Sequence, residues 1–190
     1  AGHHGWRADK LKALYNAGFS VLIAGYRGYG GNPGAPHEEG LYKDGQAFYD
    51  WLVTKTGTAP ERLFIYGESL GTGVAVRIAA DNAAAGLILE TPFDSLTATA
   101  KVHYPWIPFI DILLRDRFPS NRRIQNIDMP VMFMIAGMDE VVPPERGRHL
   151  YEIAQDPKRL KYFEDARHNG LDPDRFVPYV ATFVRDHVPQ

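Results

Sequence analysis

The sequence contains one serine in a setting typical of a nucleophile. Residues 67–71 read GESLG and stand between a short apolar run and a helical pattern. A serine on a tight strand-to-helix turn projects its hydroxyl away from the sheet, and the flanking glycines let the backbone fold without Cβ clashes. The first N–H groups of the helix, beginning at Leu70, can stabilise an oxyanion. We therefore predict that Ser69 is a nucleophile; a purely structural turn is the alternative.

A serine hydroxyl needs a base to accept its proton. Among the seven histidines, His168 is favoured because it follows the last strand pattern by a few residues, in the loop at 165–170. Active sites of open parallel sheets gather at the carboxyl ends of strands. Four others are expected to be solvated or packed, namely His37, His103, His149 and His187. At the start of the sequence, His3 and His4 have no metal partner at helical spacing.

The base in turn needs an acid that fixes its tautomer and stabilises the imidazolium. Asp139 lies in the segment GMDEVVP at 137–143, directly after the apolar run at 131–136. Two other carboxylates compete for the role. Asp94 follows the run that ends at Glu90, and Glu140 is the neighbour of Asp139. We favour Asp139 because it is better placed after the turn glycine.

Short apolar runs alternate with helical patterns along most of the chain. The expected strands are 21–24, 63–66, 87–89, 131–136 and 160–163, and the expected helices are 7–16, 38–55, 70–82, 144–154 and 172–187. Most of the runs are nearly continuous rather than alternating, which is typical of strands covered on both faces. The pattern predicts an α/β fold with a doubly wound, mostly parallel sheet.

Residues 92–130 interrupt this alternation. They contain no convincing strand, and prolines divide them into short pieces around an apolar stretch at 106–114. This segment is either a helical insertion that packs its apolar face onto the domain or a cap that forms one wall of a substrate pocket. For the pocket itself we expect contributions from Tyr26, Glu68, Trp106 and Phe109.

The composition of the chain excludes several classes of function. The chain has 190 residues, of which 45% are hydrophobic and 23% charged, and a formal net charge of −2. These values indicate one globular domain and no overall attraction to nucleic acid. The absence of cysteine excludes disulfides, thiolate metal sites and cysteine nucleophiles. The apolar runs are far shorter than the ~20 residues that span a bilayer.

The chain order Ser69, Asp139, His168 resembles that of the α/β-hydrolase superfamily. The closest resemblance is to the branch that includes depalmitoylases, monoglyceride lipases and small bacterial esterases. The matching motifs are GYRGYGG at 25–31, GESLG at 67–71, GMDEVVP at 137–143 and His168-Asn169. The resemblance implies one α/β-hydrolase domain over residues 1–190, with 92–130 as a cap-like insertion, and no metal or other cofactor.

Two departures from the family pattern stand out. Relatives carry an acidic residue where this sequence has Gly25, and the start Ala1-Gly2 resembles the end of the turn that supplies the second oxyanion donor. In the relatives, the strand before that turn lies between those corresponding to 21–24 and 63–66. We therefore expect that these two segments do not pair directly, and that the chain is part of a longer polypeptide or that another segment fills the gap.

The resemblance implies ester hydrolysis through an acyl-enzyme, on a small-molecule or lipid acyl ester, without nucleic acid as a partner. Association with a membrane would then depend on a segment outside this chain. A serine peptidase of the same fold is one alternative, with Glu68 or Asp111 holding the substrate amine. A non-catalytic binding protein is the other, because one fold hosts many functions.

Overall fold

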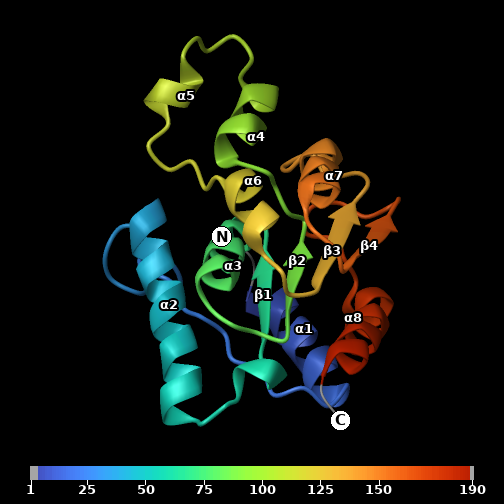
Figure 1. Cartoon of the computed structure of the whole chain (residues 1–190). Helices are drawn as coiled ribbons and strands as arrows, with labels where there is room; N and C mark the ends of the chain where they lie inside the picture. The colour runs from blue at the N-terminus through green and yellow to red at the C-terminus, as the bar shows by residue number, and fades with distance from the viewer. Residues whose placement is uncertain (1–3, 189–190) are drawn as a thin grey trace.

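A parallel sheet of four strands forms the centre of the computed structural model, which describes residues 4–188 (Figure 1). The strands lie side by side in chain order: β1 (Phe64–Glu68), β2 (Gly86–Glu90), β3 (Val131–Ala136) and β4 (Lys158–Phe163). All neighbouring pairs are parallel. Their carboxyl ends therefore meet at one edge of the sheet, which is the edge that positions the candidate site.

Both faces of the sheet are buried because alternate side chains of each strand enter different apolar clusters. In β3, Met132 and Met134 point into one cluster, whereas Val131 and Phe133 point into the other. Successive side chains of a strand lie on opposite faces, so a strand covered on both sides must be apolar throughout. This explains the continuous apolar runs of β2 and β3.

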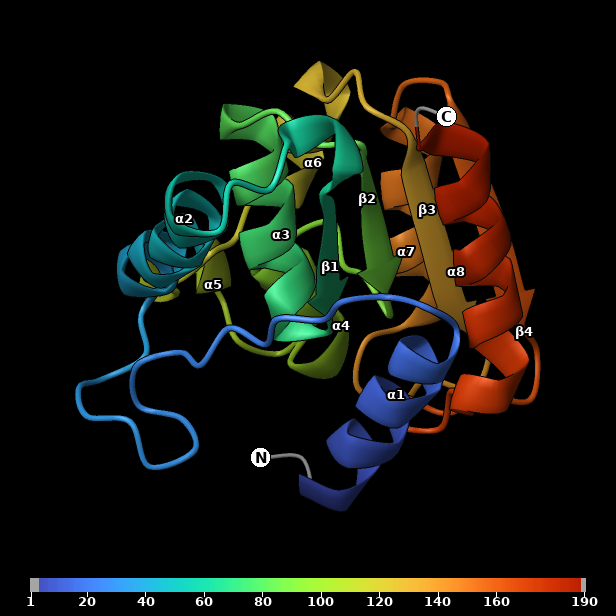
Figure 2. The same ribbon diagram turned by 90° about the horizontal axis from the view of Figure 1, so that it is seen from below.

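Helices cover the two faces of the sheet (Figures 1 and 2). On one face lie α1 (His4–Asn16) and α8 (Pro173–His187), which contribute Leu14, Phe176 and Phe183 to the first cluster. On the other lie α3 (Leu70–Asp81) and α7 (Pro144–Ile153), and α2 (Glu38–Lys55) packs outside α3. The short helix η1 (Pro60–Arg62) precedes β1. The sheet is thus doubly wound, as predicted.

The predicted strand at 21–24 is wrong. Val21, Leu22 and Ile23 are exposed and lie in an irregular segment that crosses beneath the sheet between α1 and α2 (Figure 2). A strand needs a neighbour for its backbone N–H and C=O groups. Among residues 4–188, β1 pairs only with β2. β1 is thus an edge strand of the described sheet, and the segment at 21–24 does not pair directly with it, as expected.

The insertion at 92–130 is mostly helical. It contains α4 (Leu96–His103), α5 (Ile110–Leu113), α6 (Ser120–Arg123) and the short helix η2 (Ile124–Asn126). Phe118, Ile124 and Ile127 are buried and hold its second half on the domain. The first half, α4 and α5, projects beyond the carboxyl ends of the strands (Figure 1). No helix within residues 4–188 is both long and apolar enough to cross a membrane.

Candidate active site

Ser69 occupies a sharp turn between β1 and α3. Its backbone has φ 52° and ψ −121°, a conformation that residues with a side chain rarely adopt. Its N–H donates to the carbonyl oxygen of Glu90 at 3.0 Å, which ties the turn to the end of β2. At Gly67 a Cβ would lie 2.6 Å from the carbonyl oxygen of Gly71, so only glycine fits there. The close approach of strand and helix thus forces the serine outward.

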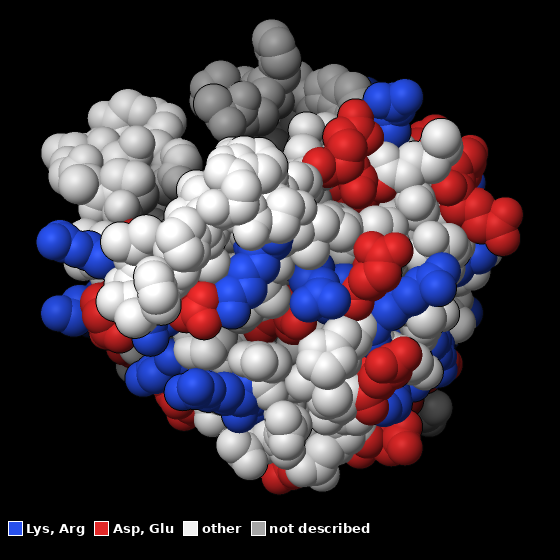
Figure 3. Space-filling view, turned by 90° about the horizontal axis from the view of Figure 1, so that it is seen from above, with Lys and Arg blue, Asp and Glu red and all other residues white. Residues whose placement is uncertain are grey.

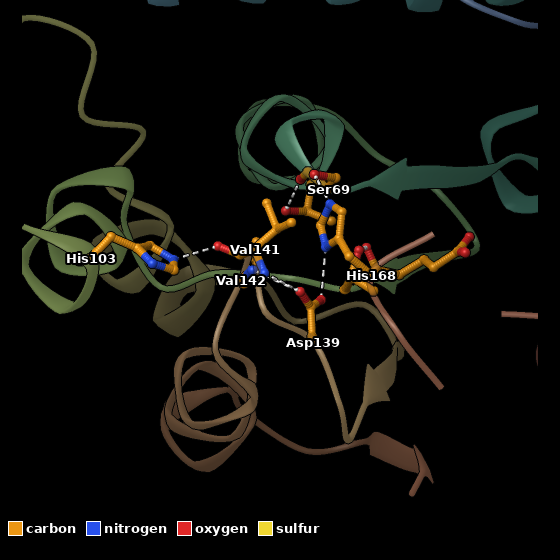
Figure 4. A network of polar contacts seen from close by, with 9 residues as sticks. Ser69, His103, Asp139, Val141, Val142 and His168 are labelled. Atoms are coloured by element: carbon orange, nitrogen blue, oxygen red, sulfur yellow. Dashed lines mark hydrogen bonds and ion pairs between the residues drawn. The ribbon is translucent and has the colours of Figure 1, made fainter. Parts of the chain in front are cut away.

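Three side chains form a hydrogen-bonded chain at this edge (Figure 4). Ser69 Oγ lies 2.8 Å from His168 Nε2, and His168 Nδ1 lies 2.7 Å from Asp139 Oδ2. His168 and Asp139 are both buried. A histidine that bonds an acid through one nitrogen presents the other nitrogen to the serine hydroxyl as an acceptor. The arrangement can therefore move a proton from Ser69 to His168.

The loop after β3 fixes the carboxylate of Asp139. Its Oδ1 accepts the backbone N–H groups of Val141 (2.9 Å) and Val142 (2.8 Å), which leaves Oδ2 to face the imidazole. Gly137 brings this loop against the end of β4, since a Cβ there would lie 2.5 Å from the carbonyl oxygen of Glu164. Both oxygens of the acid are thus held in place before any substrate binds.

The competing acids are engaged elsewhere. Buried Asp94 accepts the N–H of Ser95 and an Arg146 guanidinium, and Glu140 pairs with Arg167. The structure thus brings Asp139, rather than its two rivals, to His168.

Among the residues whose side chains the structure describes, His168 is the histidine that bonds Ser69. His37 Nδ1 accepts the N–H of Gly40 at the start of α2, and His187 bonds the carbonyl oxygen of Phe183. His149 is exposed, and His103 bonds the carbonyl oxygen of Val141. No group of three or more His, Asp or Glu side chains between residues 4 and 188 is placed to hold a metal ion.

Leu70 is the first residue of α3, so its N–H belongs to the helix start, where N–H groups have no partner one turn earlier. It lies next to Ser69, where an oxyanion would form. The second donor is expected just before residue 1 or at its very edge, which is outside the described residues, as is His3.

The structure does not enclose the four expected pocket residues in one cavity. Trp106 and Phe109 are 71% and 74% exposed on the insertion. Tyr26 is half-buried and packs against the cluster around α2. Glu68 is half-buried and bonds Lys10 at 2.8 Å. Their role in binding substrate stays a prediction.

The sequence did not predict a buried ionic cluster that lies beneath the turn at Ser69. Lys10 Nζ on α1 lies 2.8 Å from Glu68 and 2.6 Å from Glu90, and the Tyr66 hydroxyl donates to Glu90. Burial raises the pKa of Glu90 and Tyr66. Burial alone would lower the pKa of Lys10, but the attraction of the two carboxylates outweighs it and raises that pKa. One feature of the sequence could have indicated this cluster, namely the carboxylate of Glu90 at the end of an otherwise apolar strand.

The amino-terminal part of the chain, residues 1–122, matches the family model described as "Serine aminopeptidase, S33". The chain is 42% identical over 174 residues to the uncharacterized protein Rv2307c of Mycobacterium tuberculosis, covering 92% of this chain and 61% of that protein. It is 34% identical over 198 residues to lysophosphatidylserine lipase ABHD12 of Danio rerio, covering 95% and 49%. The chain thus spans about half to three-fifths of the length of these relatives.

The fold is also similar to that of solved structures. The crystal structure of a Paleococcus ferrophilus monoacylglycerol lipase superposes with a TM-score of 0.71 at 21% identity, covering 97% of this chain and 90% of that one. At this identity the likeness supports the fold alone. That fold is the α/β-hydrolase architecture.

Proposed function

Since this chain belongs to the serine aminopeptidase S33 family and has the α/β-hydrolase fold, we propose that it is a serine hydrolase that cleaves carboxylic or thio esters through an acyl-enzyme. The observation that carries the proposal is the hydrogen-bonded chain from Ser69 through His168 to Asp139. A hydroxyl 2.8 Å from an imidazole that is itself oriented by a buried carboxylate is the arrangement that activates serine.

In the proposed first step, Ser69 Oγ attacks the ester carbonyl while His168 Nε2 accepts the hydroxyl proton. Asp139, fixed by two backbone N–H groups, stabilises the imidazolium without taking the proton itself. The Leu70 N–H stabilises the oxyanion of the tetrahedral intermediate. When the intermediate collapses, His168 returns its proton to the departing alkoxide or thiolate, which leaves Ser69 acylated.

Water completes the cycle. His168 Nε2 accepts a proton from a water molecule as its oxygen attacks the acyl carbonyl, and the second tetrahedral intermediate expels Ser69 Oγ. The proton then returns to that oxygen, which restores the enzyme and releases the carboxylic acid. Both half-reactions use the same groups, so the geometry given for the resting site serves each of them.

Lipid esters are the substrate class that we favour. The similar proteins include a lysophosphatidylserine lipase and a monoacylglycerol lipase, and both names indicate glycerolipid esters. The exposed apolar side chains of the insertion, including Trp106 and Phe109, agree with an acyl substrate rather than a strongly charged one. We propose a glycerolipid ester as the substrate.

A fluorophosphonate probe tests the proposal, because it reacts only with an activated serine. We expect stoichiometric labelling of the purified protein and none of the Ser69→Ala variant. Hydrolysis of p-nitrophenyl esters of increasing acyl length should accompany labelling. A correctly folded protein that neither reacts with the probe nor cleaves any ester would be the non-catalytic binding protein of the second alternative.

A peptidase of the same fold is the other candidate, because the family to which the chain belongs is described as serine aminopeptidase S33. Such an enzyme needs an acidic group to hold the substrate amine. Of the two candidates, Glu68 bonds Lys10 and Asp111 bonds Lys101, both at 2.8 Å, so each carboxylate already has a cationic partner. Aminoacyl p-nitroanilides assayed beside the esters separate the two activities, and amide cleavage without ester cleavage would favour the peptidase.

A further inference from the structure

His103, the last residue of α4, connects the insertion to the loop that follows β3. Its Nε2 lies 2.8 Å from the carbonyl oxygen of Val141, across 38 positions of sequence (Figure 4). A carbonyl oxygen only accepts hydrogen bonds, so Nε2 is the donor, and it carries a proton in one neutral tautomer and in the charged ring. The imidazole is half-buried. This contact is more specific than the solvated or packed role expected from sequence.

The carbonyl that His103 bonds belongs to a peptide group that also holds Asp139. The C=O of Val141 and the N–H of Val142 are the two ends of one planar unit. That N–H donates to Asp139 Oδ1 at 2.8 Å, and the N–H of Val141 donates to the same oxygen at 2.9 Å. A hydrogen-bonded path therefore runs from His103 through this peptide group to Asp139 and on to His168 (Figure 4).

Two physical effects pass from one end of the peptide group to the other. Because the unit is rigid, a donor fixed at its carbonyl oxygen also limits the tilt of its N–H. Donation to the carbonyl polarises the group, which makes its N–H a stronger donor. Both effects favour one orientation of the Asp139 carboxylate, with Oδ2 facing His168 Nδ1 at 2.7 Å. Water could satisfy the same carbonyl oxygen, but a mobile water would not fix the position of the peptide group.

The helix that carries His103 is held at both of its ends. At its start, the carboxylate of buried Asp94 accepts the N–H of Ser95 at 2.7 Å and bonds the guanidinium of Arg146 on α7 at 3.2 Å. Ser95 then caps the helix by accepting the N–H of Ala98 at 3.0 Å. At its end lies the bond from His103 to the loop after β3. The imidazole is therefore a donor on an anchored element.

The side of the molecule that carries the insertion has charges of both signs. Figure 3, which views this side, shows Asp and Glu as well as Lys and Arg side chains beside an uncharged stretch. Glu140 and Arg167, an exposed ion pair at 2.9 Å, lie directly beside Asp139 and His168 in sequence. Exposed charges of opposite sign offset each other and are screened by salt. The position of Asp139 therefore depends on hydrogen-bond geometry rather than on a surface field.

We propose that His103 is a positioning residue, which holds the carboxylate of Asp139 toward His168 through the peptide group of Val141 and Val142. The inference rests on the proposed function, because the imidazolium that Asp139 stabilises forms during catalysis. His103 acts only through this carboxylate. The insertion thereby contributes to the arrangement of the candidate site as well as to the pocket wall expected of it.

Hydrolysis of a short soluble ester tests the role of His103. We expect His103→Ala to lower kcat about fivefold, the effect of one ordinary hydrogen bond, and to change KM less than twofold. His103→Gln, whose amide nitrogen donates at a similar reach, should restore kcat to within about twofold of the parent protein. Lys101→Ala is the matched control on α4, since it removes a bond to Asp111 within the insertion, and it should leave kcat unchanged.

A double-mutant cycle locates the effect. If His103 acts through the carboxylate, its removal should matter little once that charge is gone. We therefore expect His103→Ala to change the kcat of the Asp139→Asn variant by less than twofold. A fivefold loss in both backgrounds would overturn the proposal. So would an undiminished kcat in His103→Ala, a glutamine that fails to restore it, or an equal loss in Lys101→Ala.

Proton NMR of the resting protein separates this inference from the proposed function. The proton between His168 Nδ1 and Asp139 lies in a short hydrogen bond, so its resonance is expected far downfield and needs no substrate. His103→Ala should move this resonance, whereas His103→Gln and Lys101→Ala should not. A shift in a protein that fluorophosphonate does not label would refute the hydrolase and keep the link. Labelling of the parent protein, without a shift or a loss of kcat in His103→Ala, would refute the link alone.

Discussion

Lys10 Nζ lies 2.6 Å from Glu90 Oε2, which joins α1 to the end of β2 across 80 positions of sequence. The carbonyl oxygen of the same Glu90 accepts the N–H of Ser69. Glu68, which also bonds Lys10, is the residue directly before Ser69. One ammonium group thus pairs with two carboxylates at the base of the turn at Ser69. Since Glu90 is fully buried, its charge has no access to water for compensation.

Removing this ammonium should destabilise the fold. We expect Lys10→Met to lower the free energy of unfolding by about 3–5 kcal/mol, because it leaves a buried carboxylate without its cation. The measurement is urea denaturation at neutral pH. Lys12→Met on the same helix is the control, since Lys12 is exposed, and it should change stability by less than about 0.5 kcal/mol.

The second substitution separates charge from packing. Adding Glu90→Gln to Lys10→Met removes the unpaired charge and keeps an acceptor for the Tyr66 hydroxyl, so part of the lost stability should return. If the double variant is as unstable as the sum of the two single variants, the pair is not coupled and the loss in Lys10→Met comes from packing alone.

The same cluster predicts how the free energy of unfolding changes with pH in alkaline solution. The folded pKa of Lys10 is raised above its ordinary value of 10.5, so its contribution to stability is complete below that value and is lost as the pH rises through the folded pKa. The difference in unfolding free energy between wild type and Lys10→Met should therefore be constant from neutral pH to about pH 10 and shrink above it. Because lysines and tyrosines outside the cluster titrate equally in both proteins, the difference isolates Lys10 and the groups that it contacts. A difference that grows with pH would contradict this sign.

Much of the fold could be predicted because its central strands, β2 and β3, are buried on both faces. Continuous apolar runs such as 131–136 have few other stable arrangements, and the observed β3 has those same bounds. The helix at 38–55 could be predicted equally well from the periodicity of its apolar face. The segment at 21–24 has a similar composition, but strand formation also requires a neighbour, which local sequence does not specify.

The residues of the candidate site could be predicted from sequence for a related reason. Parallel strands bring their carboxyl ends to one edge, so Ser69, Asp139 and His168 can be placed together from strand positions alone. The ionic cluster could not be found this way. Lys10 reaches Glu90 through the packing of α1 on the sheet, and neither its helix position nor its neighbours distinguish it from an exposed lysine.

The role of Asp139 is tested by changing its charge while keeping its shape. Asp139→Asn should lower kcat by about 10⁴-fold, because an amide cannot stabilise the imidazolium and favours the wrong tautomer of His168. Ester hydrolysis and the rate of fluorophosphonate labelling measure the effect. Thermal unfolding should show a folded protein.

Two other carboxylates, Glu140 and Asp94, provide the comparison with Asp139. Glu140→Gln removes a surface pair with Arg167 and should leave kcat within about twofold. Asp94→Asn changes the rival acid, whose carboxylate bonds Arg146 rather than His168, so its kcat should exceed that of Asp139→Asn by several orders of magnitude. If Asp94→Asn instead loses as much activity as Asp139→Asn, the assignment of the acid is wrong.

The two glycines of the nucleophile motif should differ in their tolerance of a methyl group. At Gly67 a Cβ would lie 2.6 Å from the carbonyl oxygen of Gly71 and 2.7 Å from the Cβ of Ala75, and both belong to the rigid start of α3. Gly67→Ala should therefore lower the free energy of unfolding by about 1–3 kcal/mol. It should also displace Ser69 and so slow fluorophosphonate labelling. At Gly71 nothing lies within 4 Å of the added Cβ and the backbone is helical, so Gly71→Ala should be neutral or stabilising by up to about 1 kcal/mol. Urea denaturation of both variants compares them under the same conditions. A motif that needs both glycines for its backbone, as the sequence pattern indicates, would instead make the two substitutions equally damaging.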